Sequence, residues 1–250
     1  MNPYYGWGLP VNISEHGAQI DRLITLLHIF MIALFAGWFI FLITALVKFR
    51  ARQGHQAAYH QNHYKAPAYI EVFVALFEVL LLAGFSFPIV RHMRNEMPDA
   101  SKALQVHITA EQFAWNIHYP GRDGKFGRTK PALIKPGSPV GLDPDDPNGK
   151  DDIVTINQLN IPVNKPVIVH LTSKDVIHSF FLPVMRIKQD AIPGQMIPVW
   201  FEANKTGKFE IACAQLCGLG HYRMRGFFNV MAPEEFEKWV TSKTKKIRNL

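Results

Sequence analysis

Residues 23 to 47 read LITLLHIFMIALFAGWFIFLITALV and contain no charged side chain. A helix needs about 20 predominantly apolar residues to cross a bilayer, so this stretch predicts a membrane-spanning helix. Residues 1–22 form a polar segment in front of it, whereas a cleaved signal peptide has a shorter apolar core near its start. We therefore expect the span to be retained and residues 1–22 to form an outer N-terminal segment.

A second apolar stretch, residues 69 to 90, reads YIEVFVALFEVLLLAGFSFPIV and is also long enough to span a bilayer. It carries Glu71 and Glu78. An ionised carboxylate in lipid is costly, so each has to face protein or water, or be protonated. Because residues seven apart fall on one helix face, the pair predicts a face that packs against a partner subunit. The alternative is that Glu71 lies at the headgroup level and only Glu78 lies in the apolar region.

The connection between the two spans indicates their orientation. Residues 48–68 include the basic side chains Lys48, Arg50, Arg52 and Lys65. Basic residues concentrate in cytoplasmic loops, so this connection is expected in the cytoplasm and both chain ends outside. Residues 23–95 are thus predicted to form a transmembrane hairpin.

From about residue 100 the pattern changes to short β-rich runs separated by Pro and Gly turns, such as LQVHITAEQFAWNIHY from residue 104. This pattern predicts an all-β sandwich or barrel over residues 100–235. Residues 120–152 are rich in Pro, Gly and Asp and predict a long excursion with little regular structure. Residues 236–250 are taken as a C-terminal tail, into which an amphipathic helix from Pro233 extends.

The composition excludes some functions. The chain of 250 residues has a formal net charge of +7, but its basic residues are dispersed, so nucleic acid is not an expected partner. It has two cysteines, Cys213 and Cys217, which rules out a disulfide framework. A local disulfide, a reactive dithiol or a metal site remains possible for them.

Five soft donors stand near the end of the β region. His178 lies upstream, and the loop CAQLCGLGHYRM contains the other four, Cys213, Cys217, His221 and Met224. Thiolate, imidazole and thioether ligands select copper, especially Cu(I), over hard cations. Two sulfurs on one tight loop can bridge two ions and leave one imidazole for each, which indicates a two-copper electron-transfer centre.

Two alternatives remain open for this loop. Structural zinc accepts the Cys-x3-Cys spacing together with imidazoles, but it gives no reason for Met224. A local disulfide between Cys213 and Cys217 in an oxidising compartment would leave His221 and Met224 as ordinary surface and core residues.

These motifs together resemble the cytochrome c oxidase subunit II family over nearly the whole chain. The resemblance rests on the two-span hairpin, the HSFFLP run from His178, the KQDAIPG run at residues 188–194 and the cysteine loop. It implies a cupredoxin-like copper A domain that holds two copper ions. By this resemblance His178 and Met224 serve one copper, and His221 and the backbone carbonyl of Gln215 serve the other. Cys213 and Cys217 bridge the two ions.

The resemblance also implies the function. Subunit II of such an oxidase accepts electrons from a c-type cytochrome and passes them to haem in subunit I, which holds the haem and copper B for oxygen reduction. The complex is a proton-translocating oxidoreductase, and this chain would hold no oxygen-reducing site.

The expected partners are subunit I, subunit III, the cytochrome and the lipid bilayer. The expected location is the bacterial plasma (inner) membrane, with the copper domain on the periplasmic side. Candidates for attracting a basic cytochrome are Asp145, Asp146, Asp151 and Asp152.

The sequence departs from the family pattern at several functional positions. Gln215 replaces the usual Glu, whose carboxylate helps to hold a magnesium ion at the border with subunit I, so the magnesium is in question while the carbonyl is retained. Phe113 replaces the Trp at which electrons arrive, which leaves Phe113 or Trp115 for that role, with a place in the sandwich core as the alternative for either. Glu71 resembles the family's Glu at the mouth of a proton path, and Glu78 falls where that motif has Pro.

Three other functions share parts of this pattern. A membrane-tethered copper carrier would bind one labile Cu(I) per chain. Nitrous oxide reductase has a similar copper loop but is built on a large propeller, which 250 residues cannot contain. A quinol oxidase subunit II shares the hairpin and the sandwich but lacks the copper ligands that this sequence carries.

Overall fold

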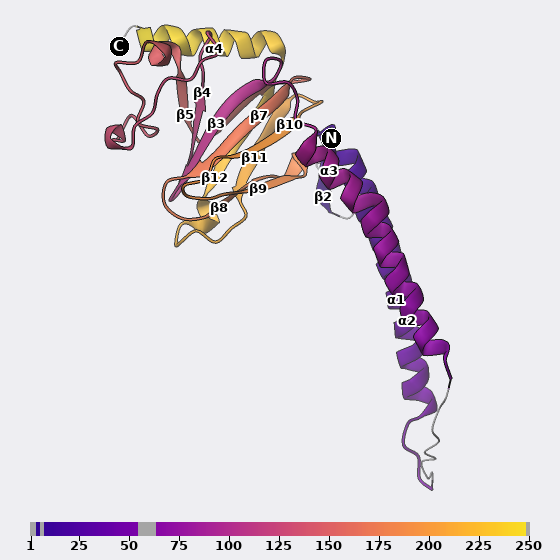
Figure 1. The fold of residues 1–250 in the computed structure, drawn as a ribbon. Helices are drawn as coiled ribbons and strands as arrows, with labels where there is room; N and C mark the ends of the chain where they lie inside the picture. The colour runs from indigo at the N-terminus through magenta and orange to yellow at the C-terminus, as the bar shows by residue number, and fades with distance from the viewer. Residues whose placement is uncertain (1–3, 6–7, 55–63, 249–250) are drawn as a thin grey trace. The chain divides into compact units, whose positions relative to one another are not determined.

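The chain divides into two compact units in the computed structural model (Figure 1). The structure describes residues 4–5, 8–54 and 64–248. One unit, called here the outer unit, consists of Met1–Ala18 and Met93–Leu250, and the helical unit consists of Gln19–His92.

The helical unit is built from two long apolar helices. Helix α1 covers Gly17–Lys48, and helix α2 covers Ala66–Leu81. A π-helical turn, η1 (Leu82–Ser86), continues α2 into α3 (Phe87–Asn95). Pro88 lacks an N–H, and in a regular α-helix its ring collides with the carbonyl four residues earlier, which accounts for the wider turn at this place. Residues 55–63 of the predicted cytoplasmic connection lie outside the described residues.

The surfaces of these helices are apolar and largely uncovered. Phe30 of α1 contacts Phe77 of α2, with ring centroids 4.4 Å apart. Other large side chains are exposed, including Phe35 and Trp38 at 68% and 64%. Both helices, Gly17–Lys48 and Ala66–Asn95, are long and apolar enough to cross a membrane. An apolar surface of this extent needs lipid or a partner protein to cover it.

The outer unit contains two five-stranded sheets (Figure 1). The first has the strand order β10-β7-β3-β4-β5 and the second β6-β12-β11-β8-β9, with parallel pairs only at β3–β7 and β6–β12. The strands of the first sheet are β3 (Leu104–Glu111), β4 (Ala114–Tyr119), β5 (Ile153–Ile156), β7 (Pro166–Ser173) and β10 (Ile197–Glu202). Those of the second are β6 (Gln158–Pro162), β8 (His178–Leu182), β9 (Ile187–Ala191), β11 (Gly207–Cys213) and β12 (Arg225–Met231).

The hydrophobic core of the outer unit combines side chains from both sheets. Buried positions alternate along β3 at Val106, Ile108 and Ala110, as expected for a strand with one face on the core. Trp115 of the first sheet and Phe180 of the second are fully buried and meet edge to face, with centroids 5.5 Å apart. The predicted fold, a two-helix hairpin followed by an all-β cupredoxin-like sandwich, is confirmed.

The N-terminal segment packs onto the β-sandwich. The backbone N–H of Ile13 donates to the Val184 carbonyl at 3.0 Å, and the N–H of Asn204 donates to the Ile13 carbonyl at 2.8 Å. The Ile13 side chain is buried in the core. A short hairpin, β1 (Tyr4–Tyr5) with β2 (Leu9–Pro10), precedes it.

Residues 120–152 contain little regular structure, as predicted. Their helical turns are the short 3-10 segments η2 (Pro131–Leu133) and η3 (Pro147–Asp151). The last described element is α4 (Pro233–Arg248), whose Phe236 and Val240 are buried against the sandwich. Two further 3-10 turns, η4 (Pro183–Met185) and η5 (His221–Arg223), connect strands.

Candidate metal centre

The soft donors come from strand ends that the second sheet places side by side. His178 is the first residue of β8, and Cys213 is the last residue of β11, which pairs with β8 through Cys213 and Phe180. The loop after β11 runs as far as Met224, and β12 begins at the next residue, Arg225. It is closed by a hydrogen bond from the Cys213 N–H to the Met224 carbonyl at 3.2 Å. The antiparallel pairing therefore brings distant residues to one edge of the sandwich.

All the predicted ligands meet at this edge. The Sγ atoms of Cys213 and Cys217 lie 3.9 Å apart, and both residues are free cysteines. A ring nitrogen of His178 and the two Sγ atoms lie within 4.8 Å of one another. Three further contacts complete the cluster: Cys217 Sγ to His221 Nδ1 at 3.6 Å, Cys217 Sγ to Met224 Sδ at 3.7 Å, and Cys213 Sγ to the Gln215 carbonyl at 3.2 Å.

The burial of these side chains fits a soft metal ion. His178 is fully buried, and Cys217 and Met224 are 4% and 2% exposed. The Nε2 atom of His178 is bonded to Asp175 Oδ1 at 2.9 Å, whereas its buried Nδ1 atom has no hydrogen-bond partner. An unsatisfied buried nitrogen is costly unless it has another role. A metal ion beside the two sulfurs would supply the missing partner.

The electrostatics of the cluster disfavour a free Cys217 thiolate. Burial, together with the neighbouring Cys213, raises the pKa of the Cys217 thiol to about 11. The apo thiol therefore stays protonated at neutral pH, because desolvation disfavours its anion. A bound cation reverses that preference by displacing the proton, so metal binding releases protons and weakens as the pH falls.

The two candidates for electron arrival occupy different environments. Phe113 lies at the turn between β3 and β4, and its ring fills the space beside Gly218 and Gly220 of the cysteine loop, where an added β-carbon would collide with it. Trp115 is fully buried in the core, 6.2 Å from the His178 ring centroid. Phe113 thus touches the candidate metal loop, whereas Trp115 is a core residue behind His178.

The acidic candidates for cytochrome docking are not a uniform surface. The side chain of Asp152 is fully buried and bonded to His118 Nε2 at 2.5 Å, so the expectation that it attracts a partner is wrong. Asp146 accepts the N–H groups of Arg128 and Asn148, and Asp151 accepts that of Arg122. These side chains stabilise the 120–152 excursion.

The two carboxylates of the second span are exposed on α2. Glu71 and Glu78 both belong to this helix, and neither is covered within the described part of the chain. The partly covered positions of α2 are Val74, Phe77 and Leu81, which fall on a different side of the helix.

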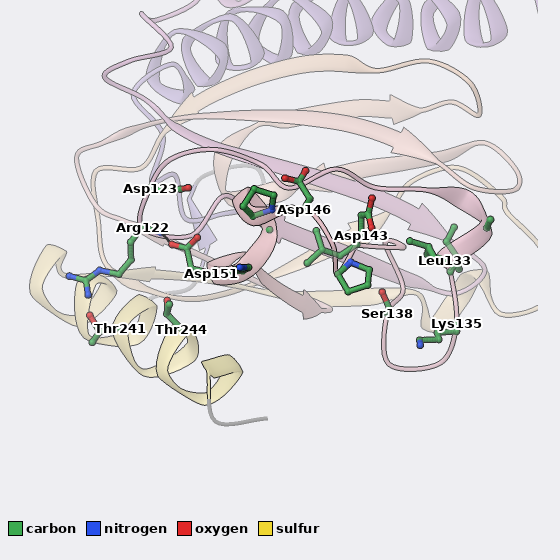
Figure 2. A pocket seen from close by; sticks show the side chains of 17 residues that line it. Arg122, Asp123, Leu133, Lys135, Ser138, Asp143, Asp146, Asp151, Thr241 and Thr244 are labelled. Carbon is green, nitrogen blue, oxygen red and sulfur yellow. Dashed lines mark hydrogen bonds between the residues drawn. The ribbon is translucent and has the colours of Figure 1, made fainter.

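A cavity of about 1250 Å³ lies elsewhere, between the excursion and α4 (Figure 2). Its lining includes Arg122, Asp151, Thr241 and Thr244. None of the soft donors lines it, so this cavity is separate from the candidate metal centre.

Two residues of the site, Asp175 and Gln112, were missed in reading the sequence. Asp175 stands three residues before His178, a spacing that offers a weak signal for a hydrogen-bond partner of a ligating histidine. Gln112 gives no comparable signal, because its contact with Cys217 joins residues 105 positions apart.

Fold and site together describe a β-sandwich protein with two helices able to cross a membrane and a cluster of soft donors that could hold a metal ion. Residues 142–229 match the family model of the periplasmic domain of cytochrome c oxidase subunit II. The alternative cytochrome c oxidase subunit 2 of Bradyrhizobium diazoefficiens is 33% identical over 235 residues, covering 94% of this chain and 83% of the relative. The chain therefore belongs to the cytochrome c oxidase subunit II family, and it is a subunit of that oxidoreductase complex. The prediction of this family from the sequence is confirmed.

Two further similar proteins are also named as subunit II of a cytochrome oxidase. Cytochrome c oxidase subunit 2 of Cereibacter sphaeroides is 28% identical over 200 residues, covering 73% of this chain and 65% of the relative. The crystal structure of the periplasmic domain of subunit II of cytochrome oxidase from Bradyrhizobium japonicum matches with 35% identity and a TM-score of 0.44, covering 60% of this chain and 99% of that structure.

Proposed function

We propose that the outer unit holds a binuclear copper centre that accepts electrons from a c-type cytochrome and passes them to haem in subunit I. The observation that carries this proposal is the pair of cysteine sulfurs 3.9 Å apart, with imidazole and thioether donors around them. A single metal site needs one such thiolate, whereas two bridging thiolates suit two soft ions. The copper pair, when bound, shares one unpaired electron over both ions, which limits the structural change that accompanies electron transfer.

The residues around the sulfurs prepare the site for this chemistry. Cys217 and Met224 are buried, which excludes water from the sulfur atoms and lowers the local dielectric constant. Gln215 is exposed and approaches Cys213 through its carbonyl, so its side chain is not needed as a ligand. His178 and Met224 are assigned to one ion, and His221 with the Gln215 carbonyl to the other. Phe113, which touches the loop, is the proposed point of electron arrival.

The helical unit supports a place in a membrane complex. We assign the chain to the bacterial plasma (inner) membrane, with the sandwich on the periplasmic side and lipid around the hairpin. Subunit I, and subunit III beside it, would cover the remaining apolar surface. Glu71 and Glu78 share an uncovered face of α2, which supports a contact with subunit I and a role on a proton path of a proton-translocating oxidase. The haem and the oxygen-reducing site are assigned to subunit I.

A magnesium ion at the border with subunit I is not part of the proposal. The family's carboxylate ligand is replaced by Gln215, and an amide is a weaker ligand for a hard cation than a carboxylate.

Copper counting on the full-length chain in detergent tests the central proposal. Wild-type protein is expected to bind two coppers and to give a mixed-valence electron spin resonance spectrum with seven hyperfine lines. Cys217→Ser removes one bridge, so we expect the mixed-valence signal to disappear and the copper content to fall to one ion or fewer, with an unchanged far-ultraviolet circular dichroism spectrum.

Gln215→Ala is the matched control in the same loop, because it keeps the backbone carbonyl that approaches Cys213. Its copper content and spectrum should equal those of the wild type. One labile Cu(I) per wild-type chain would instead indicate a copper carrier, and a bound zinc ion would indicate a structural site; either result rules out the electron relay.

A further inference from the structure

The Asp175 carboxylate lies at the centre of a hydrogen-bond network beside the candidate metal centre. Its Oδ1 atom is bonded to His178 Nε2 at 2.9 Å and accepts the Val176 N–H at 2.7 Å. Its Oδ2 atom accepts the backbone N–H of Gln112, also at 2.7 Å. One carboxylate therefore joins the start of β8 to the turn between β3 and β4.

Gln112 extends this network to the cysteine loop. Its side-chain Nε2 donates to the Cys217 carbonyl at 2.6 Å. The next residue, Phe113, packs on Gly218 and Gly220 of the same loop. The turn between β3 and β4 therefore contacts the cysteine loop through one hydrogen bond and one aromatic ring, and Asp175 is hydrogen-bonded to this turn.

The bond between Asp175 and His178 also decides which ring nitrogen can bind a metal. When the Nε2–H group donates its hydrogen bond to the carboxylate, the lone pair of the neutral imidazole is on Nδ1. Nδ1 is the buried atom of His178 that lacks a hydrogen-bond partner. A ligating histidine whose second nitrogen is held by a carboxylate is fixed in orientation as well as tautomer.

We propose that Asp175 is a positioning residue of the metal centre, which orients His178 directly and holds the Cys217 loop through Gln112. This inference rests on the proposed copper function and extends it. The carboxylate is 31% exposed, whereas the imidazole is fully buried, so the charge lies at the edge of the site. A negative charge here stabilises the more positive, oxidised form of the centre and keeps its reduction potential low.

Asp175→Asn in the copper-loaded chain removes the charge and keeps one of the two acceptor oxygens. The amide oxygen can still accept from His178, so two coppers should be retained, whereas the amide nitrogen cannot accept the Gln112 N–H. The potential of Gln112→Ala shows how much a loosened turn contributes without a change of charge. Loss of the negative charge should raise the reduced-to-oxidised ratio at a given potential about tenfold, equivalent to a shift of about 59 mV for one electron. Asp145→Asn is the control, because Asp145 is an exposed carboxylate of the excursion and its substitution changes the net charge equally.

Asp175→Ala and Gln112→Ala test whether the hydrogen-bond network holds His178 and the cysteine loop in place. Asp175→Ala removes every acceptor, so copper should pass to a chelator about 10–100-fold faster and the hyperfine pattern should broaden. Gln112→Ala keeps the charge but releases the Cys217 carbonyl, so copper loss should be faster with little change in potential. If Asp175→Ala fails to fold, Gln112→Ala still decides whether the turn holds the loop.

Wild-type potential in Asp175→Asn, together with wild-type chelation rates in the two alanine variants, would overturn the inference. Failure of the proposed function is a different result, because the wild-type chain itself would then lack the two-copper spectrum. In that case the chelation rates of the variants still report whether Asp175 and Gln112 hold whichever ion is bound.

Discussion

Met224 and Met185 are both buried methionines of the outer unit, but they have different neighbours. The Met224 Sδ atom lies 3.7 Å from Cys217 Sγ, whereas Met185 is a fully buried core residue in η4. Their burial is almost the same, so burial alone does not distinguish a donor from a core side chain. The neighbouring Cys217 sulfur is what distinguishes Met224 as a candidate donor from Met185 as a core side chain.

Replacing each of these methionines by leucine separates packing from metal binding. Methionine-to-leucine exchanges preserve volume and cost less than about 1.5 kcal/mol in a core. Met224→Leu should therefore change the unfolding free energy little but alter the hyperfine pattern and raise or lower the copper potential, because leucine has no thioether. Met185→Leu should have a similar small effect on unfolding and leave the spectrum unchanged. Identical spectra for the two variants would exclude Met224 as a ligand.

The donors could be predicted from the sequence because their chemistry and spacing are both unusual. Cys213, Cys217, His221 and Met224 stand within one loop, and few other functions require that set. Asp175 and Gln112 could not be predicted in the same way. An Asp and a Gln occur in many turns, and their role depends on contacts such as Gln112 to Cys217 that only the folded sandwich creates.

At the scale of elements, the excursion of residues 120–152 is anchored to the outer face of the first sheet. Phe126 stacks on His107 with centroids 3.7 Å apart, and the N–H of Gly127 donates to Asp152 at 2.8 Å. Asp152 in turn holds His118, which neighbours His107 across the β3–β4 pair. The composition predicted an irregular segment, but it could not predict this anchoring, because the three aromatic rings are brought together by strand register.

This anchoring makes the stability of the outer unit depend on pH. Burial, followed by the nearby His170 and His118, lowers the pKa of His107 to about 4. The unfolded chain, with a histidine pKa near 6.5, then binds more protons than the folded chain between about pH 6.5 and pH 4. Stability should be full above pH 6.5 and fall as the pH decreases towards 4. The loss should be about 1–2 kcal/mol, since the ring is only partly buried and solvent screens its charge.

Denaturant unfolding of His107→Phe against pH checks this contribution. Phenylalanine keeps a flat ring for stacking on Phe126 but cannot be protonated. The variant should match the wild type at pH 8 and lose less stability between pH 6.5 and 4. An unchanged slope would show that other groups cause the acid sensitivity.

The helices illustrate what hydropathy can and cannot determine. The apolar run of residues 23–47 lies inside α1, which begins earlier at Gly17. Hydropathy detects the part of a helix that needs lipid, whereas helix ends are set by backbone hydrogen bonds that polar residues also form. Similarly, the π-turn before Pro88 depends on backbone geometry and leaves no mark in the apolar pattern.

At the scale of the whole molecule, the two units carry different chemical groups. Every soft donor belongs to the outer unit, and the helical unit presents apolar surface with two carboxylates on one face. Substitutions in the hairpin are therefore expected to affect association with subunit I while the copper centre stays unchanged. Glu78 offers the sharper test, because it stands deeper in the apolar run than Glu71.

Glu78→Leu should weaken association with subunit I. If the carboxyl group of Glu78 is hydrogen-bonded to a partner helix, leucine leaves that partner's polar group unsatisfied, at a cost of about 1–3 kcal/mol. This corresponds to roughly a 5- to 150-fold loss of association, because 1.4 kcal/mol is tenfold. Glu78→Gln keeps a hydrogen-bonding group and should associate normally.

Leu80→Ala is the control on the opposite side of α2, where the side chain is 67% exposed. Quantitative co-purification from detergent-solubilised membranes measures the ratio of subunits, and the copper spectrum of each variant reports whether the outer unit is intact. Full association of Glu78→Leu with subunit I would show that this face of α2 does not contact subunit I.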